Sequence, residues 1–399
     1  MGWSPFRPTG LTYRDSRSFG GYTLITPIGG DAVCLIDKEG HVVHRWAVPD
    51  FQPGYGYLLP GGNLLVRGTP QVETGIGIGQ PAGETDILLE LDWGSNEVWR
   101  WEHGSFHHDM CRLPNGNTLV LIWEKLPEEL AKKVKGSLSP GQEKQVKSDR
   151  DFLSFILQGI GVGGRPRIEG VLVDAVWEIN PGGEPVHVWH AYEHLDPEVD
   201  TLCPIDFLTS WTHLNAVETT PEGHVLISSQ KLSTVMMIDW PKGNILWKYG
   251  GMGVMSHQHD PTITPEGNLL LFDNGTHHPI VGRSRVIEIN MKNKEIVWQY
   301  VPSPVFSMLS AHIAGAERLS NGNTLICEGE SGRVFEVTRE GDICWEWISP
   351  FVHDFKGVKV VMLFRAHRYA PDGPELKDKK IDPMEFEEFN KRWGLNKNV

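Results

Sequence analysis

One pattern recurs six times along the chain and restricts its fold more than any other feature. Each copy is a short apolar, often β-branched run ending near an acidic residue, then a turn with Gly, Asn or Pro, then a run ending in Trp or His. Apolar and polar residues alternate along both runs, which predicts two antiparallel strands joined by a tight turn. The six predicted hairpins cover residues 32–46, 86–101, 175–189, 234–247, 285–298 and 333–345.

A second recurring unit lies between these hairpins. It consists of one run, a turn rich in Pro, Asn and Gly, and another run, so each repeat contains four predicted strands. The chain opens at 22–28 with a strand that matches the second run of this unit but has no first, inner run before it. It closes at 364–373 with a strand that matches the inner run but has no second run after it. These two halves would complete a sixth unit. The full copies are 54–68, 107–123, 213–230, 257–275 and 312–329.

Six four-stranded units closed by the two ends of the chain predict an all-β fold, a six-bladed β-propeller. Closure of the ring also removes the exposed strand edges that an open array would leave. We assign residues 1–373 to this single domain and 374–399 to a C-terminal helical tail. A surface helix is expected from Pro383 to Trp393, as a candidate dimerisation or docking element.

One interval between hairpins is too long for the repeat. The excess is residues 124–173, which begin with a charged, helix-prone stretch and contain an apolar stretch at 151–159. A long structured insertion of this kind is typical of a lid or rim element over a site. The alternative is a solvated decoration with no part in function.

Composition excludes several classes of partner. The 37 Lys and Arg residues face 51 Asp and Glu residues, for a formal charge of −14, so a surface that follows nucleic-acid phosphates is not expected. No apolar run approaches the roughly 20 residues of a membrane span, and the start has no signal-peptide core, so a soluble cytoplasmic protein is expected. The five cysteines are far apart without a CxxC pair, which favours buried thiols over disulfides or a zinc site.

Histidines concentrate on the predicted inner strands, which line the channel of a propeller and form its usual ligand site. Such imidazoles can act as nucleophile, general base or metal ligand. Tyr55 and Tyr57 occupy the one inner strand without a histidine. The inner-strand histidines are His107, His108, His213, His257, His259, His312 and His367.

Two chemistries remain open from the residues alone. In the first, one neutral imidazole attacks a sulfuryl or phosphoryl centre while other imidazoles and an amide bind its oxygens. In the second, a metal-dependent lyase or hydrolase, a divalent ion activates water or a substrate oxygen. A third hypothesis is a propeller that binds a ligand without turnover. The metal ligands under the second hypothesis would be His108, His213, His259 and His312.

Several motifs together are similar to one known family. They are HHDMCRLPNGNTLVL at 107–121, WTHLNAVE at 211–218, LISSQ at 226–230, QHDPTITPEGNLLLFDNG at 258–275 and SRVIEI at 284–289. On these motifs the chain resembles the bacterial aryl-sulfate sulfotransferases, which transfer a sulfuryl group between phenols without a nucleotide donor. The resemblance covers about residues 20–350. It implies an aromatic small-molecule substrate and no cofactor.

The resemblance also implies roles for individual residues. His259 would be the nucleophile that is transiently sulfated, and His213 and Asn215 would bind sulfate oxygens. His108, or its neighbour His107, would be a further sulfate-binding or acid–base group. A sulfuryl group offers three oxygens, so several donors around one attacking nitrogen suit this transfer.

The chain departs from the family pattern after the strand that ends in Ser228-Ser229. The family has an arginine there, whereas this chain has Gln230 and Lys231, so the bidentate guanidinium is missing and Lys231 would supply a point charge. His312 and Tyr55 complete the expected substrate-binding residues. The inner-strand histidines that exceed the family pattern favour the metal hypothesis. They are His107, His257, His312 and His367.

Other motifs have simpler structural explanations. Asp273-Asn274-Gly275 is typical of a turn that binds the carboxylate through backbone amides, with a contact to His259 as the alternative. Asp109 and Asp260 directly follow site histidines but should point to the opposite face of their strands. Packing between blades is the expected role of the hairpin-end residues Trp99, Trp247, Trp298, Trp345, His44 and His187.

Overall fold

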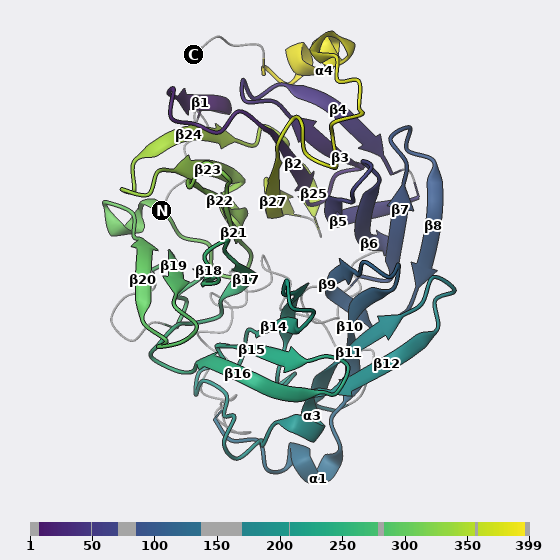
Figure 1. The fold of residues 1–399 in the computed structure, drawn as a ribbon, viewed down its shortest axis with the longest axis vertical. Helices are drawn as coiled ribbons and strands as arrows, with labels where there is room; N and C mark the ends of the chain where they lie inside the picture. The colour runs from purple at the N-terminus through teal and green to yellow at the C-terminus, as the bar shows by residue number, and fades with distance from the viewer. Residues whose placement is uncertain are drawn as a thin grey trace.

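The computed structural model describes residues 8–48, 50–70, 85–136, 170–206, 208–277, 283–355 and 358–395. Six antiparallel sheets surround a central axis, which confirms the predicted six-bladed β-propeller (Figure 1). No helix in these ranges is long and apolar enough to cross a membrane. The propeller is therefore built from β-sheets, and the short helices lie at its margins.

Four blades are built from consecutive strands, numbered from the axis outward. Each predicted hairpin forms the two outer strands of its blade, as expected. The strands are β5 (Phe51–Leu58), β6 (Leu64–Pro70), β7 (Ile87–Leu91) and β8 (Glu97–Glu102); β9 (Phe106–Arg112), β10 (Thr118–Lys125), β11 (Leu172–Ile179) and β12 (Pro185–His190); β13 (Leu214–Thr219), β14 (Val225–Ser229), β15 (Thr234–Asp239) and β16 (Asn244–Gly250); β17 (His259–Ile263), β18 (Leu269–Asp273), β19 (Arg285–Ile289) and β20 (Ile296–Tyr300).

The remaining two blades close the ring. One combines β27 (Leu363–Tyr369) with β2 (Tyr22–Pro27), β3 (Ala32–Ile36) and β4 (Val42–Ala47), so strands from the two ends of the chain pair as predicted. The other contains β21 (Gly315–Arg318), β22 (Thr324–Glu328), β23 (Arg333–Val337) and β24 (Ile343–Ile348). A strand that the sequence analysis did not predict, β1 (Gly10–Arg14), pairs with β24 as a fifth strand. The ring is thus closed at two places.

The blades are held together by apolar packing and by a repeated tryptophan contact. Phe272 and Phe335, for example, are fully buried in one cluster between neighbouring sheets. Indole N–H groups on the fourth strand of each blade donate to carbonyls in a hairpin turn of the next blade, at about 1 kcal/mol each. This confirms the packing role predicted for the hairpin-end tryptophans. The pairs are Trp46–Asp92, Trp99–Pro181, Trp101–Gly183, Trp189–Gly243, Trp247–Met291, Trp298–Arg339, Trp345–Lys38 and Trp347–Gly40.

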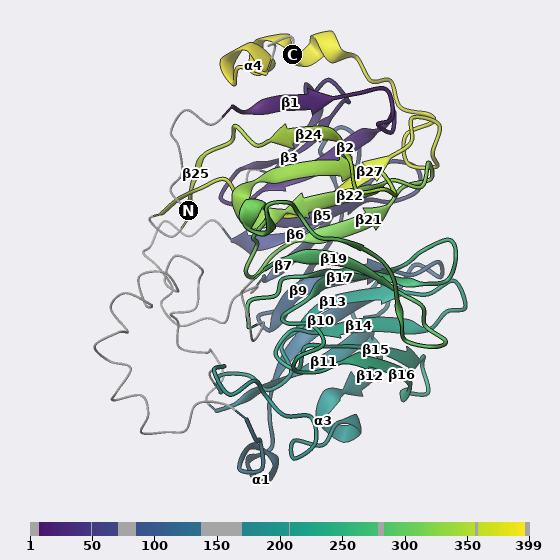
Figure 2. The same ribbon diagram turned by 90° about the vertical axis from the view of Figure 1, so that its left-hand side faces the viewer.

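Short helices and one small hairpin complete the described residues. The tail forms η4 (Pro383–Phe386) and α4 (Glu387–Arg392), close to the predicted helix, and the buried Asn390 exchanges two hydrogen bonds with the backbone of Val42. Figure 2 places α1 (Glu128–Ala131) and α3 (Ala191–His194) at the opposite end of the molecule from α4. The other elements are η2 (Val305–Ser307), η3 (Gly329–Ser331), β25 (His353–Phe355) and β26 (Val358–Val360).

The predicted insertion at 124–173 is described only at its ends. Its start completes β10 and forms α1, in keeping with the helix-prone sequence, and its end begins β11. The stretch 137–169, with the apolar stretch at 151–159, lies outside the described residues. The lid stays a prediction.

Candidate active site

Three inner strands bring histidines together at the end of the channel where these strands begin. The rings of His108 on β9 and His213, just before β13, have centroids 4.7 Å apart in an edge-to-face arrangement. Trp123 on β10 packs against both, at 5.3 Å from the His213 ring, and stacks on His107 at 4.1 Å. His259 begins the third of these strands, β17.

These three strands are irregular at the site. Each has a shift in register with its neighbour: in β9 after His107, in β13 around Asn215 and in β17 after His259. Positive φ angles accompany the shifts, at 51° for His108, 50° for His213, 56° for His257 and 55° for Asp260. Bulges redirect side chains, and such φ values in non-glycine residues cost about 1–3 kcal/mol each and cluster at functional sites.

Arg365 on β27 contacts three other inner strands, β9, β13 and β17. Its Nη1 donates to Asp109 Oδ2 at 2.9 Å, its Nε lies 3.3 Å from Asp260 Oδ1, and its Nη2 donates to the carbonyl of Asn215 at 3.0 Å. All four residues are buried. One guanidinium therefore joins the inner strands of four blades, and Asp109 and Asp260 face this arginine rather than the imidazoles they follow.

The imidazole of His259 is held in one tautomer. Its Nδ1 lies 2.8 Å from Asn274 Oδ1 and 3.0 Å from the carbonyl of His257. Asn274 donates through Nδ2 to the carbonyl of Ser310 at 2.8 Å, so its oxygen must face the ring. Nδ1 therefore carries the proton and Nε2 carries the lone pair. Burial lowers the pKa of His259 to about 3, so the ring is neutral at ordinary pH.

The contact to His259 comes from Asn274 and not from Asp273. Asp273 accepts a hydrogen bond from the backbone of Ser256 and pairs with Arg285 at 2.8 Å. The carboxylate of Asp273 is thus buried against a backbone amide, as predicted, while the alternative contact to His259 belongs to the next residue, Asn274.

His108 and His213 are also neutral. Burial, followed by the neighbouring His213 ring, holds the pKa of His108 well below its usual range. Burial and then Lys231 hold the pKa of His213 well below its usual range. Two uncharged imidazoles therefore lie side by side, and either can accept a proton once an anion has bound.

His107 supports His108 from behind. The two Nδ1 atoms are 2.9 Å apart and share one proton. On its other side, His107 Nε2 lies 3.1 Å from Asp174 Oδ1, outside hydrogen-bond geometry, and Asp174 accepts a short hydrogen bond from Thr212. Because its side chain is fully buried between these groups, His107 fits the positioning of His108 better than direct contact with a substrate.

Asn215 and Lys231 line the same region. Asn215 Nδ2 donates to the carbonyl of Gln258 at 2.8 Å, which leaves one N–H of its amide for a ligand. Lys231 Nζ donates to Thr209 Oγ1 and to the carbonyl of Ser210, both at 3.1 Å, and burial lowers the pKa of Lys231 to about 8. The Ser210 hydroxyl lies 3.3 Å from His213 Nδ1, so this lysine is close to the imidazole pair.

Arg67 on β6 is a site residue that the sequence analysis missed. It is 4% exposed, and its guanidinium forms no hydrogen bond or ion pair with the part of the chain that the structure describes. It stacks on Phe364 at 4.5 Å and lies over Tyr55 at 5.7 Å. Burial lowers the pKa of Arg67 to about 10, still well above neutrality. The sequence did contain a signal for this residue, because Arg67 lies inside the apolar run LLVRG and a buried arginine rarely lacks a partner.

Three residues predicted on the inner strands make their polar contacts outside the His108–His213 pair. His312 is partly exposed and forms a close pair with Glu330. Tyr55 donates to or accepts from His367 Nε2 at 2.8 Å. Both Tyr55 and His367 line a separate cavity of about 250 Å³, together with Asp109, Cys111, Glu218 and Arg365. Strand membership alone does not fix the depth of a side chain along the channel.

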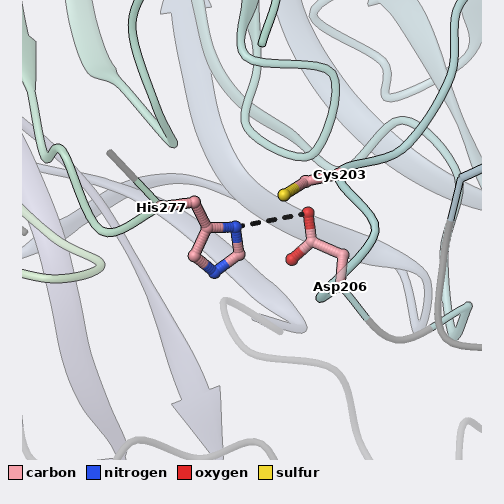
Figure 3. Close-up of side chains that lie close together, drawn as sticks. All are labelled: Cys203, Asp206 and His277. Atoms are coloured by element: carbon pink, nitrogen blue, oxygen red, sulfur yellow. Dashed lines mark ion pairs between the residues drawn. The ribbon is translucent and has the colours of Figure 1, made fainter. Parts of the chain in front are cut away.

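A second cluster lies beside His259 and includes Cys203, Asp206 and His277 (Figure 3). One donor atom from each lies within 4.8 Å of the others. His257 Nε2 is 3.2 Å from Asp206 Oδ2, and the His257 and His277 rings are 4.2 Å apart. All five cysteines are free thiols, as predicted, but Cys203 is only partly buried. None of the four histidines expected to hold a metal belongs to this group.

The fold and the convergent imidazoles define a six-bladed propeller with a histidine-rich site in its channel. A family model described as arylsulfotransferase (ASST) matches residues 143–350, more than half of the chain. The chain therefore belongs to the arylsulfotransferase family, which confirms the resemblance seen in the sequence. No curated protein matches the chain.

Solved structures resemble the chain at low sequence identity. A protein of unknown function from Bacteroides caccae is 13% identical, with 88% of this chain and 99% of that chain covered at a TM-score of 0.50. A streptogramin B lyase is 11% identical, with coverages of 87% and 84% and a TM-score of 0.45. A virginiamycin B lyase from Staphylococcus aureus with quinupristin is 10% identical, with coverages of 89% and 88% and a TM-score of 0.45. At these identities the first likeness shows the fold alone.

Proposed function

We propose that the protein transfers a sulfuryl group from an aryl sulfate ester to a phenolic acceptor, through a transient sulfohistidine at Nε2 of His259. The observation that carries this proposal is the fixed tautomer of His259. Asn274 and the His257 carbonyl hold the proton on Nδ1, and burial keeps the ring neutral, so a lone pair is available on Nε2. Family membership supports transferase chemistry.

In the first half-reaction, Nε2 forms the N–S bond as the bond between sulfur and the aryl oxygen breaks. The departing phenolate takes a proton from His108 or His213. The imidazole takes up that proton from solvent when the substrate binds, because a bound sulfate anion raises the proton affinity of nearby imidazoles. In the second half-reaction the same imidazole removes the acceptor's proton, and the phenol oxygen takes the sulfuryl group from His259.

Several groups suit the three sulfate oxygens. His213 and the remaining N–H of Asn215 are neutral donors, and Lys231 adds a positive charge. We assign the bidentate role missing at position 230 to Arg67, whose guanidinium is buried beside the site with no protein partner among the described residues. Cations gathered in the channel of a chain with charge −14 would focus the field on an anionic substrate.

The decisive experiment combines turnover with trapping of the intermediate. Protein is incubated with 4-nitrophenyl sulfate and a phenol, the release of nitrophenol is followed, and peptides from a basic quench are analysed by mass spectrometry. We expect sulfated phenol and a sulfated peptide containing His259. His259→Asn should abolish both, whereas the surface control His224→Asn should retain both. Transfer by His259→Asn would refute the proposal.

The same assay separates the other hypotheses. A metal-dependent lyase or hydrolase built on His108, His213, His259 and His312 predicts turnover that is lost with chelator and regained with metal. A propeller that only binds predicts affinity for the ester without product. These hypotheses, a cytoplasmic location and a homodimer stay predictions from the sequence.

A further inference from the structure

Four side chains beside the active site have no part in the proposed transfer. Cys203 and Asp206 lie on the segment between α3 and β13, His257 lies two residues before β17, and His277 follows β18. Figure 3 shows the thiol, the carboxylate and the His277 ring directed toward one another. Three chain segments from two neighbouring blades therefore present potential metal ligands to one place.

The spacing of these donors is close to that of a bound metal. Bond lengths of about 2.0–2.3 Å around tetrahedral zinc place two ligand atoms roughly 3.5 Å apart. Asp206 Oδ2 lies 3.2 Å from His257 Nε2 and 3.9 Å from His277 Nδ1. The donor atoms of Cys203, Asp206 and His277 all lie within 4.8 Å of one another. His257 lies outside this group of three and contacts it through Asp206, so small side-chain rotations would bring all four donors to tetrahedral spacing.

The cluster also leaves a polar group unexplained. His277 Nδ1 is buried and has no hydrogen-bond partner in the described chain. Asp206 is 7% exposed, and beside its carboxylate are two imidazoles and a thiol. A divalent cation would give His277 its missing partner and would balance the buried carboxylate. Thiolate, imidazole and carboxylate together are the ligand types of zinc.

We propose that Cys203, Asp206, His257 and His277 bind a divalent ion of the zinc class, which we term the clip site. All four positions are then taken by protein, so the ion is structural rather than catalytic. It ties the segment that leads into β13 to the blade of β17. Because the His257 carbonyl accepts from His259 Nδ1, the ion would also stabilise one support of the reactive imidazole.

The proposal is tested on the full chain, purified without a histidine tag. We expect about one zinc per chain by elemental analysis, and a lower unfolding temperature in EDTA that added zinc restores. Cobalt bound to the apoprotein should show a thiolate charge-transfer band. Cys203→Ser should remove this band and weaken metal binding roughly tenfold or more, whereas the matched control Cys111→Ser should keep both.

The clip site fails if the wild-type protein contains no stoichiometric metal and cobalt gives no thiolate band. It also fails if Cys203→Ser keeps the band. His259→Asn separates this proposal from sulfuryl transfer, since the variant should lose activity and still bind cobalt as the wild type does. An active, metal-free wild-type protein would overturn the clip site and leave the transfer mechanism standing.

Discussion

The tautomer of His259 can be tested through the residue that sets it. Asn274→Ala removes the acceptor at 2.8 Å from Nδ1 and leaves only the His257 carbonyl at 3.0 Å. The ring can then place its proton on Nε2, the atom that must attack. Loss of a buried hydrogen bond of this kind costs about 1–3 kcal/mol, which corresponds to a roughly 5- to 150-fold fall in kcat. KM should change little, because Asn274 does not contact the substrate in the proposed mechanism.

The assay is steady-state turnover of 4-nitrophenyl sulfate, with Asn268→Ala as the matched control. Asn268 is a comparable asparagine in the turn before β18, bonded to Glu288, and its loss should leave kcat unchanged. Nitrogen NMR of labelled histidine reports the tautomer without turnover. Wild-type kcat in Asn274→Ala, with an altered tautomer, would refute the reasoning.

A second variant at this position predicts a change in pH dependence. Asn274→Asp places a carboxylate beside Nδ1 and stabilises the imidazolium, so the pKa of His259 should rise from about 3. The protonated ring cannot attack. The acid limb of kcat/KM should therefore move to higher pH in the variant, an effect that a merely structural role for Asn274 would not produce.

Three further predictions concern the cations of the channel. Arg67→Met should lower kcat/KM roughly 10- to 150-fold, because a hydrogen bond to a charged group contributes about 1.5–3 kcal/mol. The same variant should raise the unfolding temperature, because an unpaired buried charge opposes folding. Unchanged kcat/KM would exclude Arg67 from the site. Arg365→Met should cost about 3–5 kcal/mol in urea unfolding, since Asp109 and Asp260 would lose their buried partner, and a cost below about 1 kcal/mol would contradict the central role of this arginine. Wild-type kcat/KM should fall as pH rises through about 8, where Lys231 loses its proton, and Lys231→Met should be less active and lack this limb; the same limb in the variant would assign it to another group.

The arrangement of strands into blades could be predicted because each hairpin has its own signal in the local sequence. Every hairpin has its own alternation and turn residues, and the unmatched strands at 22–28 and 364–373 revealed the closure. Strand β1 was missed because five residues at the margin of the repeat have no partner nearby in the sequence. Its partner, β24, lies more than three hundred residues away along the chain.

The site was only partly predictable for a related reason. Channel geometry explains why His108 and His213 meet, since inner strands of adjacent blades converge. Alternation correctly predicted that Asp109 and Asp260 point away from the histidines they follow. It did not reveal that both meet Arg365, because a contact between inner strands of different blades leaves no local pattern in the sequence. Asn274 was overlooked in favour of Asp273 because the sequence cannot say which neighbour in a turn points inward.

The position of Arg365 has a consequence for the timing of assembly. Arg365 follows Asp109, Asn215 and Asp260 in the chain. Their contacts with its guanidinium can therefore form only after the last inner strand, β27, has been synthesised. A nascent chain on the ribosome would already carry His108, His213 and His259 while the hub that orders their strands was still missing. Under the proposed function, the ability to turn over substrate would then be gained in one step, when β27 inserts beside β2.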